Sequence, residues 1–259
     1  MARWRSGFGT ALGMFTVIPV PAVSEIDPGL ARRTMGAFPL VGAVVGALAA
    51  GAYCVGSARS ELLGAVLAVA VLALLTGGLH LDGLADTADG LGSRKPAAQA
   101  LAIMKRSDVG PMGVVTLVMV LLVDVAALAA LPRSWAMCAI ALGAVTGRVI
   151  IVGACSERNS SARPGGFGSL FAGVVPVWVV WLEWILVAAL WGSAGWWLLG
   201  SNAAGYVLVA GALSGAVGWA WRGHLARRLG GMTGDTFGSI IEVTQLATFL
   251  LMTAAFSFV

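Results

Sequence analysis

Seven stretches of the chain are long and apolar enough to cross a lipid bilayer, and no other feature limits the fold as strongly. The hydrocarbon core of a bilayer is about 30 Å thick, so a spanning helix needs about 20 mostly apolar residues. The stretches cover residues 38–57, 61–79, 112–131, 135–154, 170–190, 195–219 and 238–258. We therefore predict an all-α, polytopic membrane helix bundle with about seven transmembrane helices, formed by residues 1–259 as a single membrane domain.

The composition agrees with a chain that is mostly surrounded by lipid. Hydrophobic residues make up 59% of the sequence and charged residues only 11%, and the mean hydropathy is +0.91. Soluble domains carry about 25% charged residues, so this chain lacks the polar surface that a water-exposed globule needs. Residues 3–18 are also apolar, but this short segment ends at Pro19 and Pro21. It predicts an interfacial or re-entrant helix and not a further span.

The positive charges indicate how the chain is oriented in the membrane. The net charge of +4 does not indicate nucleic-acid binding, because the basic residues are scattered at the ends of apolar segments. Seven spans put the N-terminus and the loops 80–111, 155–169 and 220–237 on one face. Of the 16 lysine and arginine residues, only Arg59 and Arg133 fall on the other face. The positive-inside rule therefore predicts that the first face, with its long polar loops, is cytoplasmic and carries the functional site.

The segment 77–90 carries three aspartates at helical spacing. Asp82, Asp86 and Asp89 stand at i, i+4 and i+7, so a helix places them on one stripe. Three carboxylates at a membrane border repel each other unless a divalent cation lies between them, and oxygen ligands suit Mg²⁺ or Mn²⁺. We therefore predict that these aspartates bind a metal ion. The spacing alone fits both metal-assisted phosphoryl transfer and cation transport.

Basic and polar residues near glycine-rich stretches of the same face are the predicted phosphate contacts. Guanidinium groups bind phosphate through two hydrogen bonds, and glycines let backbone amides approach an anion. The basic candidates are Lys105, Arg106, Arg148, Arg163, Arg227 and Arg228. Asp235, between Thr233 and Thr236, either caps the last span or binds a metal or substrate, and the motif favours binding. Glu242 is an ionisable residue inside that span and is therefore a further site candidate.

Seven short motifs are spread over nearly the whole chain. They are residues 15–21, 38–42, 79–90, 103–113, 147–148, 163–168 and 229–238. Together they resemble the signature of the cobalamin synthase family, also called adenosylcobinamide-GDP ribazoletransferases. The aspartate motif and the Thr-Gly-Asp-Thr motif around Asp235 are the most specific pair.

The resemblance implies an enzyme of a bacterial plasma membrane. Its reaction would be a phosphoryl transfer, in which the 3′-hydroxyl of α-ribazole, or of its 5′-phosphate, attacks the cobinamide-side phosphorus of adenosylcobinamide-GDP and GMP leaves. The cofactor would be Mg²⁺, or Mn²⁺, held by Asp82, Asp86 and Asp89. Asp89 or His80 would accept the proton of the hydroxyl. The expected partners are these small molecules, membrane lipid and a second copy of the chain, with no nucleic acid.

The resemblance also implies where the substrates bind. The expected contacts are Lys105, Arg106, Asp108, Arg148, Arg163, Arg227, Arg228, Thr233, Asp235, Thr236 and Glu242. If residues 82–89 hold the metal and the diphosphate, residues 227–235 are left to position a nucleotide or ribazole. These two segments meet only if the second and seventh spans lie side by side at their cytoplasmic ends. His80 has an alternative role as an interfacial histidine with a satisfied hydrogen bond.

Two other functions fit some of these features. A CDP-alcohol phosphotransferase of phospholipid synthesis also uses an aspartate-rich helix, but its pattern has arginine where this chain has Asp86 after Ala85. A cation transporter would place acidic residues near the middle of the membrane on facing broken helices. In this chain the three aspartates cluster at one border, which favours an enzyme.

Overall fold

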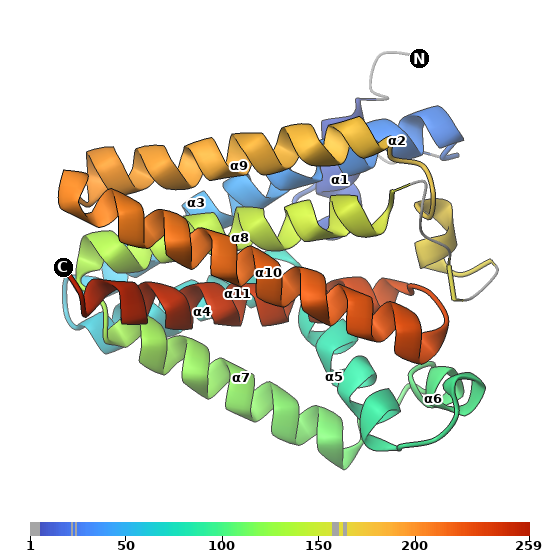
Figure 1. The fold of residues 1–259 in the computed structure, drawn as a ribbon. Helices are drawn as coiled ribbons and strands as arrows, with labels where there is room; N and C mark the ends of the chain where they lie inside the picture. Colours follow the sequence, from blue (N-terminus) through green and yellow to red (C-terminus); the bar gives the residue numbers. More distant parts are fainter. Residues whose placement is uncertain (1–5, 22, 24, 157–160, 163–164) are drawn as a thin grey trace.

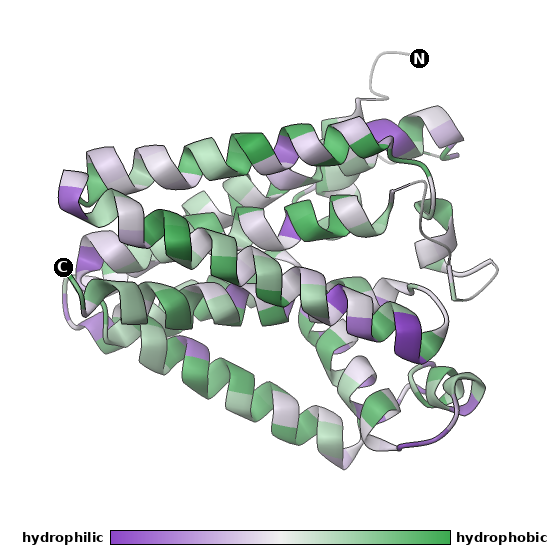
Figure 2. Cartoon of the chain, viewed as in Figure 1, coloured by the Kyte–Doolittle hydropathy of each residue, from purple (hydrophilic) through white to green (hydrophobic). Residues whose placement is uncertain are grey.

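The computed structural model describes residues 6–21, 23, 25–156, 161–162 and 165–259, and the regular elements of this part are all helical. Six of the helices are long and apolar enough to cross a membrane, and a bent helix pair raises the number of spans to seven. The prediction of an all-α polytopic bundle with about seven spans is confirmed. Figure 2 shows that apolar residues dominate the long helices, while hydrophilic residues gather at helix ends such as the last turns of α10.

The helices follow the chain in an order that largely matches the predicted spans. They are α1 (Gly7–Phe15), α2 (Pro28–Gly36), α3 (Phe38–Ser57), α4 (Glu61–Leu75), α5 (Leu79–Gly92), α6 (Ala97–Ile103), α7 (Pro111–Ala129), α8 (Arg133–Ala154), η1 (Phe167–Leu170), α9 (Val177–Leu198), η2 (Ser201–Ala203), α10 (Ala204–Leu229) and α11 (Gly234–Phe256). The short α1 packs against α2 and α3, as the brief apolar segment before Pro19 predicts. Ser6 caps this helix by accepting a hydrogen bond from the amide of Gly9 at 3.0 Å.

The predicted bounds of the fifth and sixth spans, 170–190 and 195–219, are wrong. The corresponding helices are α9 and α10, and the turn between them follows Gly200, which has φ of +100°. The predicted loop 191–194, which contains Gly192, lies inside α9, and so does Gly195, the predicted first residue of the sixth span. A Cβ atom at Gly195 would lie 2.8 Å from the Cα atom of Ala204, so this glycine lets α9 and α10 pack closely. The error arose because these glycines lower the local hydropathy in the same way as a turn.

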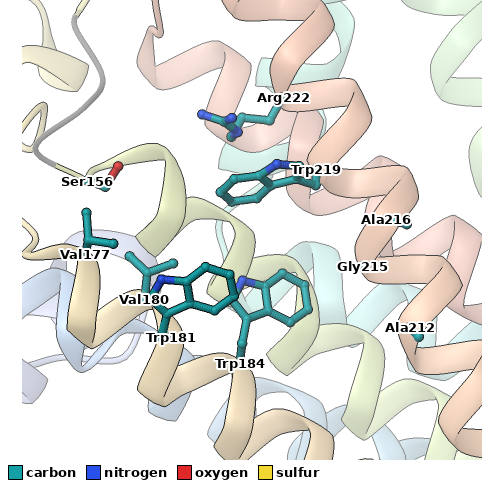
Figure 3. A pocket seen from close by; sticks show the side chains of 10 residues that line it. All are labelled: Ser156, Val177, Val180, Trp181, Trp184, Ala212, Gly215, Ala216, Trp219 and Arg222. Atoms are coloured by element: carbon teal, nitrogen blue, oxygen red, sulfur yellow. The ribbon is translucent and has the colours of Figure 1, made fainter.

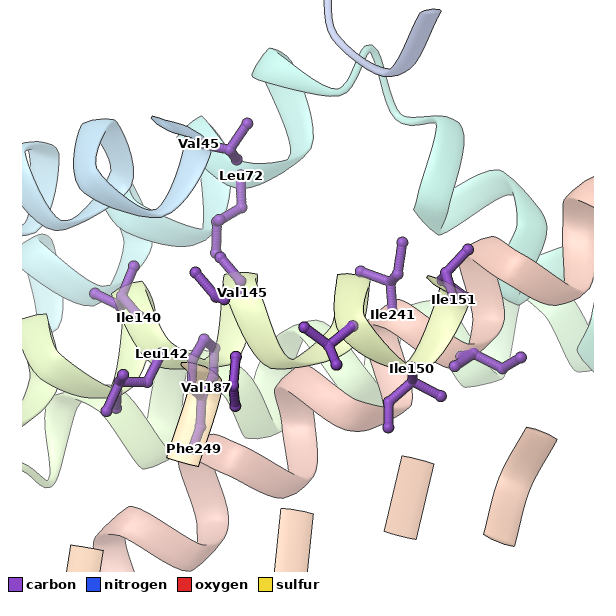
Figure 4. Close-up of a cluster of buried hydrophobic side chains, with 14 of the residues drawn as sticks. Val45, Leu72, Ile140, Leu142, Val145, Ile150, Ile151, Val187, Ile241 and Phe249 are labelled. Atoms are coloured by element: carbon purple, nitrogen blue, oxygen red, sulfur yellow. The ribbon is translucent and has the colours of Figure 1, made fainter. Parts of the chain in front are cut away.

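The helix α8 forms the centre of the bundle. In the most apolar stretch of 18 residues of this helix, 89% is buried, which is the largest share among the candidate spans. Figure 4 shows Ile140, Val145 and Ile151 of this helix among apolar side chains from neighbouring helices, including Ile241 of α11. Close backbone contacts support the packing, because a Cβ atom at Gly42 of α3 would lie 2.5 Å from the carbonyl oxygen of an α8 residue. The helix α8 is therefore the central element around which the other helices pack.

A sharp bend separates α4 from α5. The two helix axes differ by 88°, and Gly77 and Gly78 at the bend have φ of +59° and +74°. Backbone with positive φ favours glycine, because other L residues are strained there. The bend turns the aspartate motif away from the bundle axis, so α5 lies at one end of the molecule (Figure 1).

The connections are divided between the two ends of the bundle, as predicted from the span count. In Figure 1, α1, α5, α6 and the turn between α10 and α11 lie at one end. The C-terminus and the turn between α9 and α10 lie at the opposite end. The motif segments that the structure describes therefore share one face.

Candidate active site

The helices α5 and α11 touch each other backbone to backbone near their N-terminal ends. A Cβ atom added to Gly83 would lie 2.5 Å from the carbonyl oxygen of Asp235, and one added to Gly238 would lie 2.8 Å from that of His80. Only glycine leaves room for contacts this close. The first and last motif segments therefore meet, and the predicted neighbourhood of the second and seventh spans is confirmed.

A pocket of about 110 Å³ lies where the two helices meet. His80 and Asp82 of α5 and Asp235 of α11 line it together with aromatic side chains. The pocket is smaller than the several hundred Å³ of most ligand sites, so it has the size of a phosphate group and not of a whole nucleotide. An adjoining pocket of about 200 Å³ shares Asp235 with it. Together they form an acid-lined hollow beside a helix N-terminus.

Three aromatic rings form a wall of the smaller pocket. Phe15 of α1 lies 4.4 Å from Phe38 of α3 and 5.8 Å from Phe167 of η1, measured between ring centroids. These three phenylalanines are not among the predicted site residues, although all three lie in the sequence motifs. The sequence signal that could have identified them as site residues is their position in motifs that contain proline or glycine. The rings bring α1, α3 and η1 to the site.

The N-terminus of α11 is closed by a capping box. The Thr233 hydroxyl accepts a hydrogen bond from the amide of Thr236 at 3.2 Å, and the Thr236 hydroxyl accepts one from the amide of Thr233 at 2.8 Å. Both threonines are buried. The alternative that Asp235 is the cap is therefore wrong, because Thr233 holds that position. Asp235 lies in the first turn of α11 and lines the pocket.

Asp89 joins α5 to the start of α7. Its carboxylate accepts hydrogen bonds from the backbone amides of Gly110 at 2.6 Å and Gly113 at 2.8 Å. A carboxylate at a helix N-terminus satisfies unpaired amides and interacts favourably with the helix dipole. Asp89 thus has two firm hydrogen bonds, and any metal or base role competes with them.

The three predicted metal ligands face two different pockets. Asp82 lines the pocket against α11, whereas Asp86 and Asp89 line a second pocket of about 290 Å³ beside α7. Among the residues that the structure describes, no three histidine, cysteine or acidic side chains form a cluster that could hold a metal ion. The three-aspartate metal site stays a prediction.

Arg106 and Asp108 line the second pocket as an ion pair. The guanidinium donates two hydrogen bonds to the carboxylate, at 2.8 and 2.7 Å. These bonds hold the pKa of Asp108 below its usual range. Both side chains are exposed, so the pair lies where a phosphate could compete for the guanidinium.

Arg148, Glu242 and His80 form a buried polar group, and His80 also lines the pocket against α11. Arg148 is only 1% exposed, donates a hydrogen bond to the carbonyl oxygen of Ala144 at 2.7 Å and lies over the ring of Phe38. It interacts electrostatically with both His80 and Glu242. Nε2 of His80 is buried and has no hydrogen-bond partner within the described ranges. The alternative of a satisfied interfacial histidine therefore does not hold at that atom.

The remaining predicted contacts lie further from the two pockets. Arg228 donates a hydrogen bond of 2.5 Å to the carbonyl oxygen of Lys95, which ties α10 to the segment before α6. Lys105 and Arg227 are exposed and are not among the described residues that line the two pockets. Arg163 lies outside the described residues.

The fold and the site together define a class of protein: a polytopic helical membrane protein with an acid-lined, phosphate-sized pocket at one end. The sequence profile of the cobalamin-5-phosphate synthase family matches residues 7–253. The chain belongs to this family, whose members are transferases of cobalamin synthesis.

Curated relatives span nearly the same length as this chain. A protein of Frankia casuarinae named adenosylcobinamide-GDP ribazoletransferase is 36% identical over 257 residues, which cover 94% of this chain and 92% of the relative. Proteins with the same name from Pseudomonas syringae pv. syringae and Klebsiella pneumoniae are each 37% identical and cover 95% of this chain and 98% of their own. No solved structure matches the fold.

Proposed function

We propose that the protein transfers α-ribazole, or its 5′-phosphate, to adenosylcobinamide-GDP and releases GMP. The observation that carries this proposal is the juxtaposition of Asp82 and Asp235. Two carboxylates from helices far apart in the sequence line one phosphate-sized pocket, next to the N-terminus of α11. A helix N-terminus attracts an anion, and carboxylates beside it suit a metal-bound diphosphate. The names of the relatives, adenosylcobinamide-GDP ribazoletransferases, support this choice of substrates.

The reaction needs one nucleophile and one proton acceptor. The 3′-oxygen of the ribazole forms a bond to the cobinamide-side phosphorus, and the bond from that phosphorus to the bridging oxygen breaks. GMP leaves with the bridging oxygen and its electron pair. His80 is the better of the two predicted bases, because its Nε2 has no hydrogen-bond partner among the described residues, whereas Asp89 is bonded to two amides.

Mg²⁺ fits the donor set of the pocket. Proteins hold this ion through one or two carboxylates, and substrate phosphates and waters complete its shell. Asp82 and Asp235 provide two such carboxylates, and Asp86 lies one helical turn from Asp82. When bound, the ion would neutralise charge on the phosphoryl oxygens. The buried Arg148 interacts electrostatically with His80, which lines the same pocket, and adds positive charge near it.

The site faces the cytoplasm of a bacterial cell in this proposal. Among the lysine and arginine residues that the structure describes, only Arg59 and Arg133 fall at the opposite end, as the positive-inside rule requires. The nucleotide substrate is a charged cytoplasmic metabolite, which agrees with this orientation.

Purified protein in detergent, incubated with adenosylcobinamide-GDP, α-ribazole and Mg²⁺, tests the proposal. We expect cobalamin and GMP in equal amounts, and loss of both in Asp82→Asn and Asp235→Asn. Glu25→Gln is a matched control, because Glu25 is an exposed carboxylate that does not line the pocket. Wild-type turnover by the two aspartate variants, or full turnover after chelation of divalent cations, would contradict this assignment. Release of CMP from a CDP-alcohol instead of GMP would favour the alternative family.

A further inference from the structure

A further hollow, larger than each of the pockets described above, lies between α9 and α10, away from the candidate active site. Its volume is about 570 Å³, and Figure 3 shows Trp181, Trp184 and Trp219 around it with Arg222 above Trp219. The last turns of α8 separate it from the catalytic pocket. Ile151 of α8 lines that pocket, whereas Gly153 packs against Trp219. The hollow is therefore a separate site.

Small residues of α10 and large aromatic residues of α9 give the hollow the shape of a slot. Ala212, Gly215 and Ala216 form the α10 side. A Cβ atom at Gly215 would lie 2.6 Å from the ring of Trp184, so the glycine lets that indole approach the helix. Trp181 on the other side is 66% exposed on the apolar outer surface of α9. The slot consequently opens towards lipid and not towards water.

The charge of the residues that line the slot varies with their distance from the end of the bundle. Trp184 lies seven residues after Val177, the first residue of α9, so the slot extends about 10 Å along the helix from its end. Arg222 lies near the C-terminal end of α10, at the end of the bundle that carries α5. Its guanidinium carbon is 4.1 Å from the centroid of Trp219. The ten described residues that line the slot include this one cation and no acid. An apolar slot with a cation at its shallow end complements an anionic amphiphile.

We propose that this slot binds an anionic phospholipid of the leaflet on the active-site side. The phosphate contacts Arg222 at the depth of the headgroups, and one acyl chain lies between the tryptophans of α9 and the small residues of α10. A nucleoside would also stack on indoles, but it would have to enter from the lipid-exposed side of the helix pair. The opening towards lipid therefore favours a phospholipid.

Native mass spectrometry of the full-length protein, titrated in detergent with phosphatidylglycerol or phosphatidylcholine, tests the proposal. One arginine near the membrane surface favours an anionic lipid by about fivefold, so we expect phosphatidylglycerol to bind about fivefold more tightly. Arg222→Gln should remove this preference, and Arg222→Lys should retain most of it. Ala216→Trp should weaken both lipids about tenfold by filling the slot. Ala189→Phe enlarges an exposed alanine of α9 outside the slot and serves as the control.

Equal binding of the two lipids by the wild type, or unchanged binding in Ala216→Trp, would overturn the proposal. Retention of α-ribazole that is lost in Ala216→Trp while phosphatidylglycerol binding is unchanged would assign the slot to a nucleoside. If Ala216→Trp does not fold, the comparison of Arg222→Gln with Arg222→Lys still decides whether the headgroup charge is recognised.

Discussion

Asp89 accepts hydrogen bonds from two amides at the start of α7, whereas Asp82 lies exposed beside α11. The two residues share one stripe of α5, but their neighbours come from different helices. An exposed carboxylate keeps its ligand positions for a metal or substrate, and a carboxylate bonded to amides stabilises the packing of two helices. The same residue type on the same helix face thus serves two purposes.

The substitutions Asp82→Asn and Asp89→Asn should therefore affect different properties of the protein, the first turnover and the second stability. Asp82→Asn should abolish turnover and leave the midpoint of thermal unfolding unchanged, because among the described residues its carboxylate has no hydrogen bond to another helix. Asp89→Asn should lower the free energy of unfolding by about 1–3 kcal/mol, because a buried amide loses a charged acceptor. Both quantities can be measured on protein in detergent. An Asp89→Asn protein of normal stability but without turnover would show that Asp89 acts in catalysis.

The buried placement of the Arg148 side chain could not be predicted from the sequence. A lone arginine near the end of an apolar stretch predicts an orienting charge or a phosphate contact. In the structure the side chain turns back into the bundle, next to Phe38 and Glu242. This placement depends on residues from α3 and α11 that are distant in the sequence. For the same reason, the hydrogen bonds from Gly110 and Gly113 to Asp89 could not be predicted.

At the scale of helices, the contact between α5 and α11 is the feature on which the site depends. Gly83 and Gly238 face the partner helix at distances that exclude a side chain. The motifs contain both glycines, so the sequence indicated that these segments matter and that they meet. It did not indicate that the glycines themselves form the contact.

Gly83→Ala should separate α5 from α11. The added methyl group would lie 2.5 Å from the carbonyl oxygen of Asp235, so backbone has to move. We expect a destabilisation of about 1–3 kcal/mol by overpacking and a loss of turnover of at least about tenfold. Gly51→Ala is the matched control on α3, where nothing lies within 4 Å of the new atom. It should be neutral or stabilise the protein by about 0.5–1 kcal/mol. Equal behaviour of the two variants would disprove the role of the contact.

The spans themselves illustrate which features hydropathy can and cannot predict. The bounds of α3, α7 and α8 lie within two residues of the predicted ones, because these segments are continuously apolar and end at proline or polar residues. The bounds of α9 and α10 were displaced. Hydropathy does not distinguish a glycine in a helix contact, such as Gly195, from a glycine in a turn, such as Gly200.

At the scale of the whole molecule, the connections are divided between the two ends of the bundle. The end with the proposed site residues is the functional side of the protein. The functional side carries α5, α6 and the turn between α10 and α11 (Figure 1). The pockets that contain Asp82, Asp86 and Asp235 lie there, and so does the Arg222 end of the slot between α9 and α10. Substrate capture, chemistry and lipid contact are thus expected on one surface of the membrane.

Reporter fusions test this orientation. Fusions after residues 59, 133 and 259 should report the periplasmic or outer side, and fusions after residues 95 and 230 the cytoplasm. The charge asymmetry of the two ends is the physical reason. Alkaline phosphatase and green fluorescent protein provide complementary signals on the two sides. Opposite locations for residues 95 and 230 would exclude a single site shared by α5 and α11.

The shortness of α4 has a consequence for the surrounding membrane. Its 15 residues extend about 22 Å, less than the thickness of about 30 Å of a typical hydrocarbon core. Leu62 at the start of this helix and Leu74 at its α5 end are exposed, so lipid has to cover the helix along its length. We expect the resulting hydrophobic mismatch to draw the headgroups towards α5, so that bilayer thickness affects access to Asp82. Turnover should accordingly be faster in vesicles of lipids with 14-carbon chains than in vesicles of lipids with 22-carbon chains.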